Sequence, residues 1–292
     1  MNSTHRILFL LLGLSTAGSA EESQDKQSAP AEQYQALLKE FSEAVRVSYL
    51  QPDPEAKAKA KAIERIVQLS PRFLELAEKN AADAIALDAL VQVVYLELFL
   101  ESNTSHPGRG EENLEAKAIA ILLRDHVRSD RLGEATRRVM YGFSRECEIF
   151  LRAVLEKNPH RDIQALTCLR LAQFLNWRSQ RLDLLKEQPD MAKRYEWLFG
   201  KEYLETLRRQ DRADVVREVE AIFERAADEF GDVKLPYADT VGVKAKSELH
   251  ELRHLSVGKE ALDIDGVDQD GKRFKLSDYR GKVVLLDFWH HS

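Results

Sequence analysis

The stretch YQALLKEFSEAV, residues 34–45, shows the pattern that decides the fold class. Its apolar side chains recur at three- and four-residue spacing, at positions 34, 37, 38, 41 and 45. That spacing places them on one face of an α-helix, whereas a half-buried strand would alternate apolar and polar residues. The same periodicity continues to about residue 254 with no convincing strand. We therefore predict a mainly α protein with an α-helical domain over residues 32–254.

Helix-breaking residues divide this domain into about nine expected helices. A Ser before a Pro is typical of a helix cap and first turn, so we expect a new helix to begin at Ser70-Pro71. We expect Gly231 to be a C-terminal cap that ends a helix. The breaks lie at Pro52 and Pro54, Ser70-Pro71, Asn80, residues 105–110, residues 129–133, residues 158–160, Pro189, Gly200 and residues 230–232.

Two segments of the helical domain resemble each other. Residues 73–85 and residues 150–163 both run from a Phe-Leu pair through Glu-Lys-Asn to an Asp. Each pattern predicts a helix, a turn centred on Asn, and a second helix. Such hairpins bury their apolar faces against neighbouring hairpins, as in α-solenoids. We expect an irregular right-handed array of helical hairpins; a compact bundle is the alternative, because the consensus residues of tetratricopeptide repeats are missing.

The first twenty residues have the three-part layout of a secretory signal peptide. A basic start at His5 and Arg6 precedes an apolar run over residues 7–12 and the small residues 17–20. The run is too short to span a bilayer, and no Cys at the cleavage site could carry a lipid. We expect residues 1–20 to be removed, residues 21–31 to form a disordered leader, and the protein to be exported to a bacterial periplasm or secreted, with no stable membrane insertion.

The charge of the chain argues against nucleic acid or an anionic membrane as a main partner. Its 43 basic and 49 acidic residues give a net charge of −6, and no basic block overrides this balance. The charges are interleaved along the helices, which is typical of solvated helix faces. Trp177 and Trp197 occupy apolar periodic positions, so we expect them to pack in the core. We expect no cofactor, and a protein is the partner that a helical array would bind.

The sequence contains two cysteines, Cys147 and Cys168, on either side of the expected turn at residues 158–160. On antiparallel helices they would lie at comparable though unequal heights. In an oxidising compartment a disulfide between them is one alternative. Two separate buried cysteines are the other and the commoner arrangement in helical cores.

A weak metal-site candidate lies near the end of the helical domain. His250, Glu251 and His254 spell H-E-x-x-H, which on a helix can place two imidazoles on one face for zinc with Glu as general base. No third ligand occurs at the usual spacing, and Arg253 brings a positive charge into the motif. We therefore predict no metal site and interpret the motif as an exposed part of the last helix.

After Leu255 the sequence changes character. Glycines appear at positions 258, 266, 271 and 281, and the apolar period shortens to two. Residues 263–267 and 273–275 predict a β-hairpin around a tight turn at residues 269–272. Residues 276–281 predict a single helical turn with Ser277 as cap and Gly281 as stop. Residues 283–289 form a continuous apolar run, which is typical of a strand covered on both faces.

This order of elements resembles the start of a redoxin domain, in the AhpC/TSA and TlpA-like branch of the thioredoxin superfamily. The resemblance covers residues 255–292 and implies the first part of a thioredoxin-like α/β fold after the helical domain. One departure is Leu262, where the family usually has Pro. The residues that carry the structural signature are Leu276, Ser277, Asp278, Gly281, Lys282, Phe288 and Trp289, supported by Val257-Gly258-Lys259, Ala261 and Asp270-Gly271.

The resemblance implies an exported thiol-disulfide oxidoreductase, but the sequence has no Cys-x-x-Cys. In the family this motif follows the Phe-Trp pair closely, whereas here residues 290–292 read His-His-Ser. We therefore predict no catalytic residue and no dithiol exchange in this chain. The chain end is expected to reflect a nonsense or frameshift lesion, an incomplete gene model, or a UGA codon for selenocysteine. The alternative function is a helical protein-interaction module with a vestigial redoxin segment.

Overall fold

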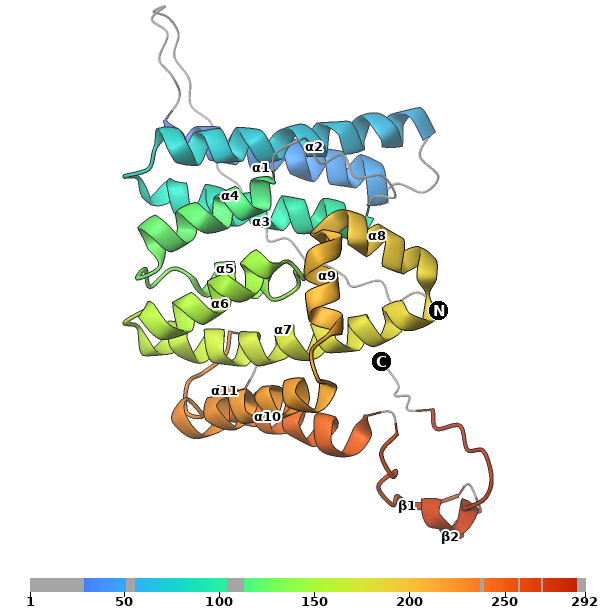
Figure 1. Ribbon diagram of the computed structural model, residues 1–292. Coiled ribbons are helices and arrows are strands. Elements are labelled where there is room, and N and C mark those ends of the chain that lie inside the picture. The colour runs from blue at the N-terminus through green and yellow to red at the C-terminus, as the bar shows by residue number, and fades with distance from the viewer. Residues whose placement is uncertain are drawn as a thin grey trace, which may run out of the picture.

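A computed structural model of the chain describes residues 29–50, 56–103, 113–236, 239–256, 258–268 and 270–287. Within these residues it contains eleven α-helices and one two-stranded sheet near the C-terminal end, which confirms the mainly α fold class (Figure 1). The expected signal peptide, most of the expected leader, Pro52, Pro54 and the expected loop at residues 105–110 lie outside the described residues. No helix within them is both long and apolar enough to cross a membrane.

The helices stack in layers along the chain (Figure 1). Each layer packs on the next, with α2 against α3, α4 against α6, and α7 against α10. This is the layered array of helical hairpins that the sequence predicts. The layers consist of α1 (Pro30–Val45) and α2 (Ala56–Lys79); α3 (Ala84–Asn103) and α4 (Leu114–Ile121); α5 (Gly133–Val139), α6 (Arg145–Lys157) and α7 (Arg161–Glu187); and α10 (Arg212–Glu229) with α11 (Val241–His250).

Three helices continue into a single π-helical turn, and one hairpin stands beside the layers. The π turns are η1 (Arg46–Leu50) after α1, η2 (Leu122–His126) after α4 and η3 (Glu251–Leu255) after α11. The hairpin of α8 (Pro189–Phe199) and α9 (Lys201–Arg208) packs on the end of α7 around a small apolar cluster of its own. That cluster contains Leu185, Tyr195, Leu204 and Leu207.

One continuous apolar core runs through the layers. Its largest fully buried side chains include Phe73, Phe150, Phe174 and Phe223, which come from α2, α6, α7 and α10. Each of these helices contributes the apolar stripe that its three- and four-residue spacing predicts. Burying a side chain of this size contributes about 2 kcal/mol. The helices are therefore stabilised mainly by contacts between layers rather than by their own propensity.

Most of the breaks predicted from the sequence separate helices in the structure. Asn80 and Asn158 lie in the turns of the α2–α3 and α6–α7 hairpins, as the internal resemblance predicts. Their hydrogen bonds differ, however. The Asn158 amide donates to the carbonyls of Val127 and Ser129 at 2.8 Å each, whereas the Asn80 amide donates to Leu76 in its own helix. Asn158 therefore joins two layers, and Asn80 only ends a helix.

The prediction of a new helix at Ser70-Pro71 is wrong. α2 runs unbroken from Ala56 to Lys79 with Pro71 in its interior. An interior proline costs about 3 kcal/mol, because it removes one backbone hydrogen bond and crowds the preceding turn. Leu69 and Phe73 on either side are both fully buried, and two such side chains offset that cost. Packing against the neighbouring helices therefore keeps the helix continuous.

α10 ends beside Gly231, where the sequence predicts a helix end, but Gly231 does not have the left-handed conformation that is typical of a capping glycine. The glycines with positive φ in the described residues are Gly200, Gly258, Gly271 and Gly281. A Cβ on Gly242 would lie 2.8 Å from the Gly231 Cα, and a Cβ on Gly231 would lie 2.3 Å from the Ala227 carbonyl oxygen. A side chain on Gly231 would therefore clash with the last turn of α10, and Gly242 has no room for a side chain because α11 begins against the Gly231 backbone.

Candidate functional site

The segment that carries the redoxin resemblance begins with a β-hairpin. β1 (Asp265–Val267) pairs antiparallel with β2 (Arg273–Lys275), at the positions that the sequence predicts, with Gly266 opposite Phe274. The Phe274 ring lies over Gly266 so closely that a Cβ there would be 2.7 Å from a ring carbon. In the turn, the Asp268 carboxylate accepts the backbone N–H of Asp270 at 3.0 Å and of Lys272 at 2.8 Å. This aspartate fixes the hairpin.

The signature residues after β2 form a 3₁₀ turn, η4 (Leu276–Tyr279), where a single helical turn is predicted. Ser277 does not cap this turn, in contrast to the prediction. Its N–H and hydroxyl both donate to the Asp263 carboxylate at 2.8 Å. The Asp278 carboxylate takes the capping role and accepts the Lys275 N–H at 2.9 Å. Asp263 precedes β1, and its charged carboxylate is a stronger hydrogen-bond acceptor for Ser277 than a neutral group of the turn.

Two more signature residues complete the turn. Gly281 has φ of +83°, so it ends the turn as predicted. The Lys282 ammonium lies 5.6 Å from the centre of the Tyr279 ring. Phe288 and Trp289, the last two signature residues, lie outside the described residues.

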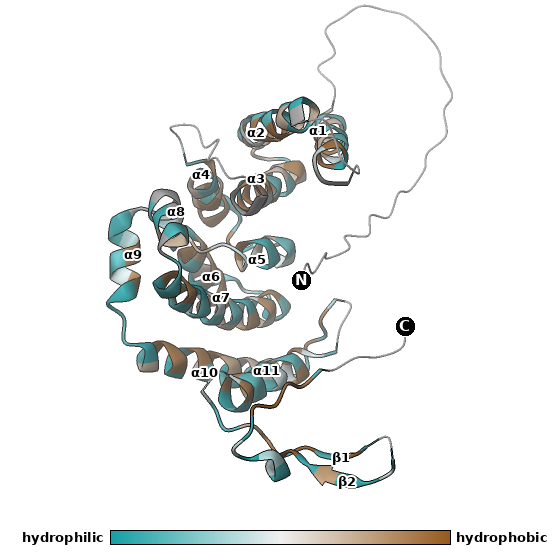
Figure 2. Cartoon of the chain, turned by 90° about the vertical axis from the view of Figure 1, so that its right-hand side faces the viewer, coloured by the Kyte–Doolittle hydropathy of each residue, from teal (hydrophilic) through white to brown (hydrophobic). Residues whose placement is uncertain are grey.

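The expected strand at residues 283–289 is not a strand in its described part. Residues 283–287 are extended without regular pairing, and the side chains of Val283 and Leu285 are 103% and 93% exposed. A strand needs a neighbour for its backbone N–H and carbonyl groups, and no described strand lies beside this run. Figure 2 shows the run as a brown trace that leads away from the hairpin towards the C-terminal end.

The whole segment projects beyond α10 and α11 rather than packing into the layers (Figures 1 and 2). The hydrogen bonds that shape it join its own residues, such as Ser277 to Asp263 and Arg280 to Glu260 at 2.8 Å. Its described side chains are not part of the continuous core of the helical array. Its local order therefore comes from turn chemistry and one short strand pair.

The two cysteines are free buried thiols, so the structure has the separate arrangement and not the disulfide. Cys168 on α7 faces α10, where its Sγ lies 3.6 Å from the Ile222 carbonyl oxygen. Burial raises the pKa of the Cys168 thiol to about 12, against a smaller opposing effect of Arg225. A thiol in that state is not a nucleophile at neutral pH.

Cys147 lies at the start of α6 in a buried polar cluster. Its Sγ donates to the Glu115 carboxylate at 2.9 Å, and the Ser144 hydroxyl lies 3.1 Å from both that carboxylate and the sulfur. Ser144 is also the N-cap of α6 and accepts the Cys147 N–H. All three side chains are at least nine-tenths buried. The cluster satisfies polar groups between α4 and α6 and is closed to a substrate.

The H-E-x-x-H motif spans the end of α11 and η3. The rings of His250 and His254 do lie on one side, with centres 5.0 Å apart. Within the described part of the chain no three His, Cys, Asp or Glu side chains are grouped to hold a metal ion. Arg253 binds Glu224 and Glu220 of α10. Glu251 and the two histidines are exposed, in agreement with the interpretation of the motif as surface.

A pocket of about 470 Å³ lies where the α2–α3 turn meets α4 and η2. Its floor is made of small apolar side chains, and its rim charges are paired. Lys117 lies 3.5 Å from Glu78, and Arg124 binds Asp125. Burial lowers the pKa of His126 at the rim. The lining residues are Ala77, Glu78, Ala81, Ala86, Leu90, Lys117, Ala120, Ile121, Arg124, Asp125 and His126.

Sequence reasoning missed a partly buried charge network around Glu148 on α6. The Glu148 carboxylate accepts from Arg178 of α7 and from Arg152 one turn later in its own helix. Arg178 is 5% exposed and also donates to the Tyr203 hydroxyl of α9 at 3.0 Å. Only the Glu148–Arg152 pair has a signal in the sequence, the four-residue spacing. The other partners come from distant helices.

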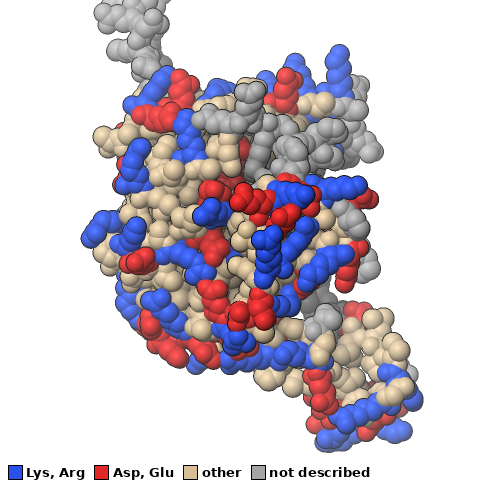
Figure 3. Space-filling model, viewed as in Figure 1, with Lys and Arg blue, Asp and Glu red and all other residues tan. Residues whose placement is uncertain are grey.

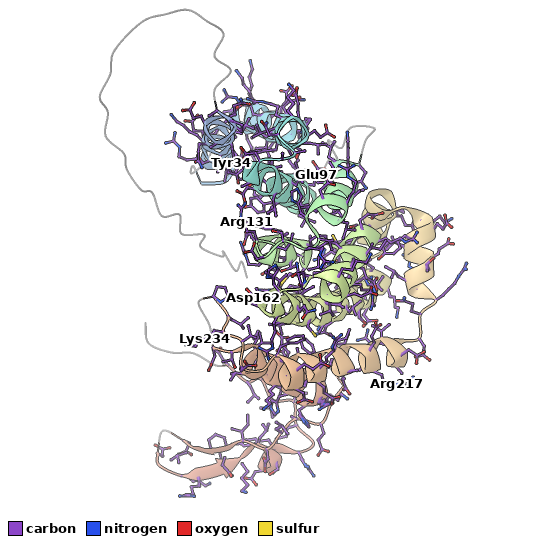
Figure 4. All side chains as sticks on the ribbon, turned by 90° about the vertical axis from the view of Figure 1, so that its left-hand side faces the viewer. Tyr34, Glu97, Arg131, Asp162, Arg217 and Lys234 are labelled. Atoms are coloured by element: carbon purple, nitrogen blue, oxygen red, sulfur yellow. The ribbon has the colours of Figure 1, made fainter. Side chains whose placement is uncertain are left out.

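Other ion pairs join the layers at the surface. Arg131, labelled in Figure 4, reaches from the turn before α5 to Asp88 of α3 and contacts both carboxylate oxygens at 2.7 Å. Its guanidinium also donates to the Ala84 carbonyl at 3.0 Å. Nη2 makes both contacts with the carboxylate, and this charge-assisted interaction joins one layer to the next.

Comparison with known proteins adds no relative. No protein-family model, no curated protein and no solved structure matches this chain.

Proposed function

We propose that this protein is an exported thioredoxin-like protein of the redoxin branch, related to thiol-disulfide oxidoreductases, and that residues 255–292 are the first elements of its redoxin domain. The observation that carries the proposal is the order of elements in that segment. A hairpin, a 3₁₀ turn over the Leu-Ser-Asp-Tyr string, a glycine stop and an extended apolar run follow one another between residues 263 and 287. The helical array would then carry this domain at its end.

We do not propose that residues of this chain carry out thiol-disulfide exchange. Thiol-disulfide exchange needs a thiolate at an accessible position and a second thiol that resolves the mixed disulfide. The sequence has no Cys-x-x-Cys, and both of its cysteines are buried and separate. We expect the 292-residue chain not to accelerate the reduction of insulin disulfides by dithiothreitol. Turnover above a blank that disappears in Cys147→Ser or Cys168→Ser would contradict this.

The proposed family itself is tested by the coding sequence that follows the codon for Ser292. We expect a Cys-x-x-Cys, or a selenocysteine codon in place of its first cysteine, to be encoded shortly after it in one of the three frames. Further downstream, the remaining strands and helices of a thioredoxin-like sheet should follow. Sequence unrelated to a redoxin in every frame would overturn the proposal.

A second candidate function is a helical protein-interaction module. The observation that favours it is the layered array itself, since stacked hairpins expose extended faces on which a partner can lie. The face shown in Figure 3 carries interleaved acidic and basic side chains, without a broad field of one sign. Such a surface suits a specific protein partner better than a polyanion.

A further inference from the structure

Three arginines of α5 and α7 lie near one carboxylate, that of Glu134, and two of them bind it. Glu134 accepts from Arg137 through both oxygens at 2.6 and 2.7 Å, and from the Arg138 Nε at 2.6 Å. Arg170 of α7, which packs against α5, lies close enough for Arg137 and Glu134 to act on its charge. This cluster is therefore positive in a chain whose net charge is −6.

Arg170 has no anionic partner of its own. Among the described residues its one polar contact is with the Met140 sulfur, 3.1 Å from its Nη1. Its Nε is buried and has no hydrogen-bond acceptor. Burial lowers the pKa of Arg170, which means that its charged form is poorly solvated where it stands. A guanidinium in that state gains more than an exposed one when a carboxylate binds it.

An exposed aromatic pair lies beside these arginines. Tyr141, just after α5, stacks on Trp177 of α7 with ring centres 5.3 Å apart and an angle of 28° between the planes. Tyr141 is 52% exposed, and it follows Met140, whose sulfur contacts the Arg170 guanidinium. The pair therefore forms an open apolar surface near that guanidinium. Trp177 is accordingly half-buried rather than a core residue, which corrects the expectation from its periodic position.

We propose that the surface formed by Arg137, Arg138, Arg170, Tyr141 and Trp177 binds an acidic peptide segment of a partner protein, with a carboxylate on Arg170 and an aromatic or aliphatic side chain on Tyr141. A guanidinium can donate several charge-assisted hydrogen bonds to a carboxylate, whereas an ammonium acts as a point charge. The stacked pair supplies the apolar contact that a small inorganic anion would not use. The site goes beyond the redoxin proposal and holds whether or not that proposal is correct.

Charge complementarity decides between a peptide and a nucleic acid. A nucleic-acid surface needs basic side chains along several phosphates, and the overall negative charge of this chain opposes a polyanion. A short acidic peptide needs only the local positive cluster. Single-stranded oligothymidylate therefore serves as the competing probe in the test.

The test uses the full chain and the fluorescence anisotropy of a fluorescein-labelled peptide in which a Tyr is flanked on both sides by Glu. We expect binding that weakens with added salt and is lost when Gln replaces Glu in the peptide. Arg170→Gln should weaken binding about tenfold, and Arg170→Lys should weaken it less, because lysine keeps the charge but not the guanidinium. Tyr141→Ala, at an exposed position, should also weaken it.

Arg128→Gln is the matched control, because Arg128 is exposed and the described residues offer it no ion pair. Its affinity should equal that of the unaltered chain, and far-UV circular dichroism should show that every variant is folded. The proposal is overturned if the unaltered chain does not bind the peptide, or if the Gln peptide binds equally well. It is also overturned if both Arg170→Gln and Tyr141→Ala leave the affinity unchanged, or if oligothymidylate binds more tightly.

Discussion

Gly142, in the turn between α5 and α6, has no room for a side chain. A Cβ there would lie 2.4 Å from the Cys147 Sγ and 3.2 Å from a Leu98 methyl group. The sulfur cannot move freely, because it is held by Glu115 and Ser144. The tight turn and the buried polar cluster therefore depend on each other.

Replacing Gly142 with Ala should destabilise the protein by about 1–3 kcal/mol, the usual cost of overpacking a core. Urea unfolding followed by circular dichroism measures the change. Gly133→Ala is the control, since a Cβ at that position meets only ordinary contacts, the nearest at 3.4 Å. That change should be neutral or slightly stabilising. If Gly142→Ala and Gly133→Ala changed the free energy of unfolding equally, lack of space at Gly142 would not be the cause of the destabilisation.

The Glu148 carboxylate joins α6 to α7 through Arg178, and its charge matters more than its size. Glu148→Gln keeps the shape but leaves Arg178, which is 5% exposed, without a carboxylate. Leaving such a charge unpaired costs about 3 kcal/mol. Glu218→Gln removes a carboxylate from the same network at a side chain that is 43% exposed, so it should cost less than about 1 kcal/mol. Chemical unfolding at neutral pH measures the free energy of unfolding of the two variants, Glu148→Gln and Glu218→Gln.

The effect of Glu148→Gln should depend on pH. Burial opposes ionisation of Glu148, but Arg178 and Arg152 outweigh it, and the pKa of Glu148 in the folded protein is lower than its ordinary value. A lowered pKa stabilises the fold above the ordinary value, and this contribution is lost as the pH falls through the native pKa. The stability difference between the unaltered chain and Glu148→Gln should therefore shrink in acid. A constant difference from neutral pH down to acid would contradict the assignment.

At the scale of elements, α2 stays a continuous helix although Pro71 lies in its middle. Pro71 is exposed in its middle, so the proline ring contributes no packing that would compensate for the lost hydrogen bond. Pro71→Ala restores the missing N–H and should stabilise the protein by about 1–3 kcal/mol. Thermal unfolding measures the gain. A loss of stability would mean that α2 requires a bend at this position.

Periodicity and turn residues predicted most of the helical elements, because these signals are local. Gly200 separates α8 from α9, and Pro189 begins α8, as the sequence predicts. The failures are at positions where a distant contact decides the outcome. Pro71 stays helical because of its neighbours' burial, and Gly242 lies so close to the Gly231 backbone that it has no room for a Cβ. Neither contact has a signal within a short window of sequence.

At the candidate sites too, local features were predicted from the sequence and contacts between distant residues were not. The positions of the β-hairpin and the 3₁₀ turn were predicted, because turn chemistry is local. The pairing of Ser277 with Asp263 across the hairpin was not. The cluster of Arg170 with α5 depends on how two helices pack, and the only local sign of it is the adjacent pair Arg137 and Arg138. Side chains from different layers could not be placed together from the sequence alone.

At the scale of the whole molecule, the chain has two parts that differ in how they are stabilised. The helical array has a continuous core through its layers, whereas residues 258–287 have turns, one short strand pair and an exposed apolar run. An isolated hairpin is marginally stable in water. An exposed apolar run is also an aggregation hazard. We therefore expect the array to fold by itself, and the C-terminal segment is not part of its core.

The most direct test of this central claim compares the full chain with a chain that ends at Ser256. Urea unfolding followed by far-UV circular dichroism should give the same midpoint for both, with a higher helical signal per residue and better solubility for the shorter chain. A shorter chain that is unfolded, or that unfolds at a clearly lower urea concentration, would show that the C-terminal segment belongs to the core and would contradict the account.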